Sequence, residues 1–162
     1  MTPGVSWRTL PRSVRVLGRW VTVVQAVGYS TALVHVWWTT RLTPAGIVNQ
    51  YRGVESEDGP MQFPKSLAEM LTLTHTHLLG MAAIFVVTGV GLALCERVSE
   101  RWKARLIAEP FVALLVSFGA MWLMRYADPR FSVVLALSSG LMAATFYLQS
   151  WLILREVVGR NG

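Results

Sequence analysis

Three histidines, His35, His75 and His77, are the residues of this 162-residue sequence whose type and spacing point most clearly to chemistry. His75 and His77 are two positions apart, so they point about 200° apart on an α-helix and cannot both face one flat cofactor. His35 can therefore pair with only one of them. Neutral imidazole is the commonest protein ligand of metals and also binds haem iron. Two histidines on neighbouring helices would hold one haem b, one on each side of the iron.

Small residues share the expected helix faces with these histidines. Gly28 and Thr31 lie seven and four positions before His35, and Gly80 lies three positions after His77. Residues at such spacings lie on one face of a helix, and small side chains leave room for a macrocycle. This pattern favours His35 and His77 as haem-iron ligands, with His75 as the alternative ligand. The same small residues are also typical of contacts between membrane helices.

The sequence is also compatible with ligands other than haem. The three histidines could hold copper or zinc, although the angle between His75 and His77 opposes a shared ion. A quinone site needs apolar walls and hydrogen-bond donors, which a histidine, Tyr51, Arg41 or Arg52 could supply. Catalytic triads, phosphate-binding loops and paired intramembrane carboxylates have no counterpart in the sequence, so no catalytic residue is assigned.

The elements that must position the histidines are four apolar runs. Hydrophobic residues make up 53% of the chain and charged residues only 15%, which is typical of a multi-pass membrane protein. The runs predict helices at residues 20–39, 67–95, 106–124 and 131–154. The second has a readable start, because Ser66 and Glu69 form a capping box. In the third, Pro110 is expected near the start, and Glu109 at the interface beside Arg105.

Orientation follows from the distribution of arginine and lysine. Ten of the fifteen lie before the first run, between the second and third, or after the fourth. Because positive residues favour the cytoplasmic side, both termini are expected to be cytoplasmic. The predicted fold is a single all-α transmembrane domain over residues 1–162, an integral membrane four-helix bundle. Its outer loop, about residues 41–65, has no helical period and carries an acidic patch of Glu55, Glu57 and Asp58.

Residues 74–81, THTHLLGM, carry a resemblance to a known class of proteins. An H-x-H-x-x-G run opening a membrane helix resembles small multi-helix membrane proteins of bacterial respiratory systems, some related to haem-bearing oxidase subunits and b-type cytochromes. Residues 50–53 and 63–66 show a weaker similarity to the same proteins. The resemblance implies a location in the bacterial inner membrane and carries a haem-ligand role onto His75 or His77, and by inference onto His35. The absence of histidine from the last two runs departs from cytochromes with four ligands.

These observations predict a membrane subunit of a respiratory or redox complex. It would bind one haem b, or form a quinone site, near the periplasmic face, and pass electrons to or from redox subunits that dock on the outer loop. The alternative is a cofactor-free structural subunit that anchors a larger membrane complex. Nucleic acid is not an expected partner, because the arginines flank apolar runs and form no single basic face.

Overall fold

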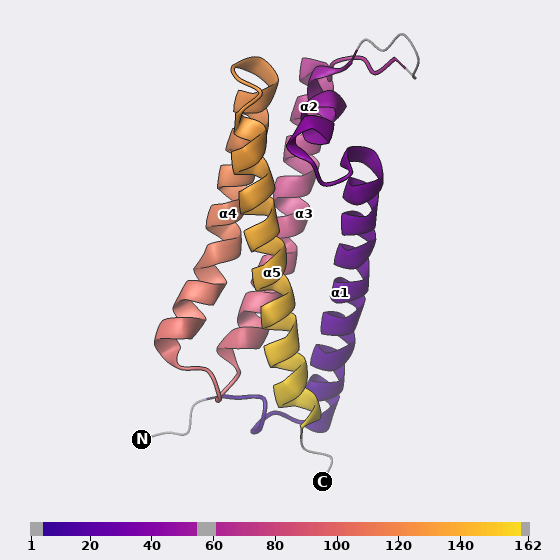
Figure 1. Ribbon diagram of the computed structural model, residues 1–162. Coiled ribbons are helices and arrows are strands. Elements are labelled where there is room, and N and C mark those ends of the chain that lie inside the picture. Colours follow the sequence, from indigo (N-terminus) through magenta and orange to yellow (C-terminus); the bar gives the residue numbers. More distant parts are fainter. Residues whose placement is uncertain (1–4, 55–60, 160–162) are drawn as a thin grey trace.

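Five α-helices make up the part of the chain that the computed structural model describes, residues 5–54 and 61–159. They are α1 (Arg12–Thr40), α2 (Pro44–Arg52), α3 (Leu67–Ala93), α4 (Glu100–Tyr126) and α5 (Phe131–Val158). The four long helices run alternately in opposite directions, and the short α2 lies near the end where α1 stops (Figure 1). The all-α prediction is confirmed, but the prediction of four helices is wrong because the outer loop contains α2.

Three of the four long helices, α1, α4 and α5, extend beyond the apolar runs that predict them. The helix expected at residues 20–39 begins at Arg12, and the one expected at 106–124 begins at Glu100. The last, expected at 131–154, continues to Val158, whereas the second ends at Ala93 instead of residue 95. Arginine, lysine and glutamate are good helix formers, so the charged flanks continue the helices past the hydrophobic stretch. Apolar runs therefore locate the helix centres and miss their polar ends.

The capping box at the start of α3 is confirmed. The Ser66 hydroxyl accepts a hydrogen bond from the Glu69 backbone N–H at 3.3 Å, and the Glu69 carboxylate accepts one from the Ser66 N–H at 2.8 Å. Two backbone donors that a helix start leaves unpaired are satisfied reciprocally. This fixes the beginning of the helix that carries His75 and His77.

A tight turn joins α1 to α2. Arg41 and Leu42 adopt left-handed backbone angles with φ of 54° and 55°, and the Thr43 hydroxyl caps α2 by accepting from the Gly46 N–H at 3.0 Å. Any side chain at Gly46 would collide with the Thr40 carbonyl oxygen, so the turn requires glycine there. The expected acidic patch, Glu55, Glu57 and Asp58, lies outside the described residues.

Three helices, α3, α4 and α5, have the length and apolar composition to cross a membrane. Large apolar side chains such as Leu79, Leu115 and Leu137 are more than 60% exposed on them, as a lipid-facing surface requires. The helix α1 is outside this set, because Gln25, Tyr29 and neighbouring hydroxyl residues dilute its apolar character. The prediction that α1 also crosses the membrane therefore stays a prediction.

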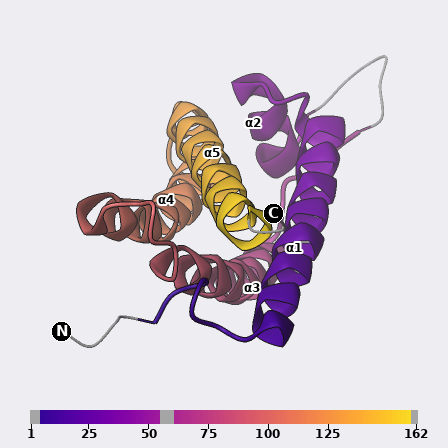
Figure 2. The ribbon, with the colours of Figure 1, turned by 90° about the horizontal axis from the view of Figure 1, so that it is seen from below.

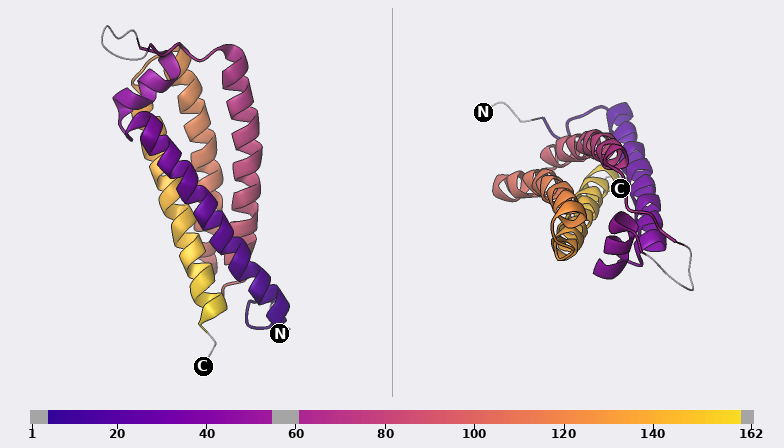
Figure 3. Two further views of the ribbon diagram at one scale, coloured as in Figure 1. Left: turned by 90° about the vertical axis from the view of Figure 1, so that its right-hand side faces the viewer. Right: turned by 90° about the horizontal axis from the view of Figure 1, so that it is seen from above.

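The core lies where all four long helices meet. Tyr29, Phe85, Leu114, Met142 and Phe146 form a buried cluster drawn from α1, α3, α4 and α5. The most extensive packing is between α4 and α5, with α3 beside this pair and α1 crossing the outside of α5 at an angle (Figures 2 and 3).

The two ends of the bundle differ. We call the arginine end the one where α1 and α4 begin and α3 and α5 finish, and the α2 end the opposite one (Figure 1). The start of α1 and the finish of α5 share the arginine end. The membrane side on which each terminus lies remains a prediction.

Candidate functional site

The three histidines lie on helix surfaces that the described chain does not cover. His35 lies in the second-last turn of α1, and His75 and His77 lie in the third turn of α3. All three residues are exposed. At a rise of ~1.5 Å per residue, His77 is about 15 Å from the start of α3, well within a helix long enough to cross a bilayer. Inside a bilayer, an exposed imidazole is costly.

His77 is held in one orientation by its own helix. Its Nδ1 lies 3.0 Å from the carbonyl oxygen of Leu73, and its ring lies 6.4 Å from that of Phe118 on α4. Because a carbonyl only accepts, Nδ1 carries the proton, and in the neutral ring Nε2 keeps a free lone pair. Metal-ligating histidines are commonly oriented by such a bond to a carbonyl oxygen. His75 has no hydrogen bond of this kind among the described contacts.

The small residues expected beside the histidines border open space. A Cβ added to Gly28 or to Gly80 would have no neighbouring atom within 4 Å. Thr31 is exposed, and its hydroxyl donates to the Val27 carbonyl oxygen of its own helix at 3.0 Å. Gly28, Thr31 and His35 lie on one surface of α1, and His77 and Gly80 lie on one surface of α3; we call these two surfaces together the histidine face. None of these five residues is used in the protein core.

The helix α1 packs chiefly against α5 and only slightly against α3. Tyr29 stacks on Phe146 with ring centroids 4.3 Å apart, and the Ser30 and Tyr147 hydroxyls lie 2.6 Å apart. His35 is six positions after Tyr29, about 120° around the helix, so it points away from this contact. Among the described residues, no hydrogen bond or ring contact joins His35 to either histidine of α3. Whether the two helices hold one ligand stays a prediction.

The described residues contain no cluster of side chains that could form a metal centre. Across residues 5–54 and 61–159, no three His, Cys, Asp or Glu side chains gather as metal ligands would. His35, His75 and His77 therefore do not form a shared copper or zinc site in the described structure.

Glu109 does not form the predicted pair with Arg105 among the described residues. Its two carboxylate oxygens are buried and have no hydrogen-bond partner among the described residues, and no ion pair joins it to Arg105 there. It lies within electrostatic range of Tyr29 on α1. The cause is the early start of α4, which puts Glu109 and Pro110 inside the helix instead of at its first turn. Charged flanks that continue a helix are the signal that was missed.

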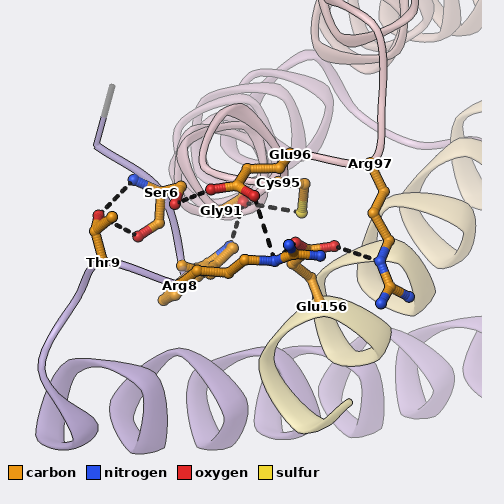
Figure 4. A network of polar contacts seen from close by, with 9 residues as sticks. Ser6, Arg8, Thr9, Gly91, Cys95, Glu96, Arg97 and Glu156 are labelled. Atoms are coloured by element: carbon orange, nitrogen blue, oxygen red, sulfur yellow. Dashed lines mark hydrogen bonds and ion pairs between the residues drawn. The ribbon is translucent and has the colours of Figure 1, made fainter. Parts of the chain in front are cut away.

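A polar network closes the arginine end (Figure 4). The Glu156 side chain is only 3% exposed, and its carboxylate lies 3.3 Å from Arg8 Nε and 3.6 Å from Arg97 Nε. Arg8 also pairs with Glu96 at 3.3 Å, and Ser6 donates to the same carboxylate. The network joins the residues before α1, the α3–α4 turn and the end of α5.

Trp7 anchors this network to the helices. Its indole N–H donates to the Gly91 carbonyl oxygen at 2.7 Å, and its backbone N–H donates to the Leu94 carbonyl oxygen at 3.1 Å. The ring is 6% exposed and lies so close to Gly18 that any side chain there would collide with it. Trp7 and Leu10, which precede the first predicted helix, are therefore part of the packed structure.

Three of the described helices are long and apolar enough to cross a membrane, and their exterior is apolar. With polar contacts at both ends of the bundle, these features define a transmembrane helical domain. Comparison with protein families gives the same class: residues 41–162 match the family Aq_1264_TM, described as a transmembrane helical domain. Because the match covers more than half of the chain, the chain belongs to this family. The matched region contains α2 to α5, and α1 precedes it. No curated protein and no solved structure matches the chain.

Proposed function

We propose that this membrane protein is a subunit of a respiratory or redox complex, with one haem b, or a quinone, bound on the histidine face. The observation that carries the proposal is the bond between His77 Nδ1 and the Leu73 carbonyl oxygen at 3.0 Å. It fixes the ring and leaves Nε2 as an available lone pair on an exposed helix surface. A bound molecule would also cover imidazoles that a bilayer does not tolerate well.

The residues present fit a haem in two respects. His77 offers an oriented ligand atom, and Gly28 and Gly80 leave open space on the two helices. His77 and His35 would then be the iron ligands, with His75 as the alternative. Haem, when bound, supplies one-electron transfer. The protein's contribution is to orient the imidazoles and to keep the cofactor beside apolar helix surfaces.

The same hydrogen bond favours haem over quinone. A quinone carbonyl needs a hydrogen-bond donor, whereas neutral His77 already uses its only N–H on Leu73. The nitrogen that remains can ligate iron but cannot donate. A quinone on this face would need a donor other than His77, and His35 is the residue there that could supply one, because Thr31 gives its hydroxyl proton to Val27.

For topology, we infer that α1 is a fourth crossing, that both termini are cytoplasmic and that the protein resides in a bacterial inner membrane. The excess of arginine and lysine at one end of the bundle supports this orientation. The α2 end would then face the periplasm. Periplasmic or membrane redox subunits would dock there, on residues 41–65.

A second function, that of a cofactor-free structural subunit, is favoured by a different observation. Each long helix carries one exposed glycine with open space around it: Gly28, Gly80, Gly119 and Gly140. Exposed small residues allow another membrane helix to approach closely. On this reading the histidine face is covered by helices of a partner, and the imidazoles hydrogen-bond across that contact.

A reduced-minus-oxidised absorption spectrum, with a quinone extraction on the same sample, separates these functions. Protein purified from its native membrane should show a b-type band that scales with protein amount. Detection of bound quinone but no haem would show that the histidine face is a quinone site. Neither cofactor in folded protein would overturn the redox proposal and leave the structural subunit.

A further inference from the structure

An arginine-lined pocket lies at the arginine end, between the beginning of α1 and the end of α5. Its volume is about 450 Å³, and it is lined by Arg12, Arg15, Val16, Arg19, Val157 and Val158. The three arginines recur at spacings of three and four, which places their side chains on one face of α1. The pocket is on the opposite end of the bundle from the α2 end and is separate from the histidine face.

A second pocket of about 260 Å³ adjoins the first through a shared residue. Arg15 lines both, and the second pocket also contains Arg8, Arg97 and Glu156. Here the positive charges have a partner, because the buried Glu156 carboxylate pairs with Arg8 and with Arg97 (Figure 4). In the second pocket, Arg8 and Arg97 are therefore paired with carboxylates of the chain itself, those of Glu156 and Glu96.

The first pocket is not balanced in this way. Within residues 5–54 and 61–159, no carboxylate lies within ion-pair distance of Arg12, Arg15 or Arg19. Three guanidinium groups gathered around one hollow repel each other and are stabilised by an anion. Planar guanidinium groups match the geometry of phosphate oxygens particularly well.

The other walls of the pocket indicate what kind of anion it holds. Val16, Val157 and Val158 give it an apolar side. Trp20 and Trp151, 58% and 53% exposed, lie on the same two helices, as side chains at the headgroup level of a membrane do. A ligand with a negative head and an apolar tail meets both kinds of wall.

We propose that this arginine pocket binds an anionic phospholipid, with the phosphate between Arg12, Arg15 and Arg19 and the acyl chains along the valines of α1 and α5. Basic pockets between helices at a membrane surface are suited to anionic headgroups. The lipid would join α1, which precedes the family-matched region, to the last helix of the domain.

Native mass spectrometry of the delipidated full-length protein tests this proposal. Phosphatidylglycerol, diphosphatidylglycerol and phosphatidylcholine would be titrated separately, with inorganic phosphate as a further arm. We expect the anionic lipids to bind at least about tenfold more tightly than phosphatidylcholine. Inorganic phosphate binding as tightly as the lipids would overturn the lipid assignment.

The chain offers a matched control for the residues. Arg15→Gln with Arg19→Gln removes two arginines four positions apart from the pocket, and Arg101→Gln with Arg105→Gln removes an equally spaced, exposed pair from α4 at the same end. The first double variant should lose about tenfold or more in lipid affinity, and the second should keep it. Replacing Arg15 and Arg19 by lysine keeps the charge but loses the planar guanidinium groups, so it should retain more binding than the glutamine variant and less than the wild type. Equal loss in both glutamine variants, or loss in neither, contradicts the proposal.

Discussion

The side-chain amide of Gln149 on α5 donates a hydrogen bond to the carbonyl oxygen of Leu106 on α4 at 2.6 Å. In a regular α-helix that carbonyl would accept from the backbone N–H four residues on, but residue 110 is proline and has none. Gln149 is 1% exposed and supplies the missing donor from the neighbouring helix. The proline inside α4 is thus tolerated because α5 satisfies the group that it frees.

Gln149→Leu should therefore destabilise the protein by about 1 kcal/mol, since it leaves the Leu106 carbonyl without a donor. Pro110→Ala restores a helical N–H to that carbonyl. In the Pro110→Ala background, the same Gln149→Leu change should cost clearly less. Free energies of unfolding in mixed micelles, measured for the four proteins of the cycle, check this. Strictly additive effects would mean that the two residues do not share the Leu106 carbonyl.

Trp7→Ala should be among the most destabilising substitutions at the arginine end. It removes a buried ring and its hydrogen bond to Gly91, at an expected cost of about 3 kcal/mol. Thermal unfolding in detergent measures the loss. Val5→Ala, two positions earlier and 70% exposed, is the control and should change stability little. Similar melting temperatures for the two variants would contradict the packed position of Trp7.

The thiol of Cys95 should react slowly with maleimides in the folded protein. Burial, with a smaller effect of the nearby Glu156 carboxylate, raises the pKa of Cys95 to about 11. The reactive thiolate is then scarce at neutral pH, so we expect labelling about a hundredfold slower than for an exposed cysteine. The rate should keep rising with pH beyond 9, where an ordinary thiol approaches its plateau. Fast labelling at pH 7.5 without denaturant would disprove the buried position.

Single cysteines in a Cys95→Ala background can test the orientation. Asp58→Cys should react with a membrane-impermeant maleimide in intact cells. Val5→Cys and Glu100→Cys should react only after permeabilisation, because α1 is proposed to cross and the arginine end to face the cytoplasm. Val5→Cys labelled together with Asp58→Cys would show that α1 does not cross. Glu100→Cys labelled in intact cells would invert the topology.

Much of the fold follows from local sequence patterns. Ser66 and Glu69 predict the start of α3 to the residue, because a capping box depends only on neighbours in the chain. The charged residues before Leu106 lie outside the predicted helix, although the chain is helical from Glu100. Hydropathy detects what a helix contacts and not where its backbone hydrogen bonds end. The helix α2 is absent from the prediction because it is short, although Thr43 and Pro44 form a helix-start signal that could have revealed it.

The site was less predictable, because it depends on contacts between distant segments. The histidines and the glycines near them could be chosen from residue type and spacing. Their exposure, the bond from His77 to Leu73 and the packing of α1 against α5 could not. The same holds for Trp7, whose partner Gly91 is 84 positions away in the chain. Tertiary contacts of this kind leave no local signature in a single sequence.

Haem content with matched histidine variants tests the proposed function most directly. His77→Ala and His75→Ala remove imidazoles two positions apart on one helix, but only His77 has its ring oriented by a carbonyl oxygen. Reduced-minus-oxidised spectra of the purified wild type and of both variants, at equal protein amounts, should show a b-type band that His77→Ala and His35→Ala abolish and His75→Ala retains. A wild type without the band, or a band that survives His77→Ala, would contradict a haem held by His77.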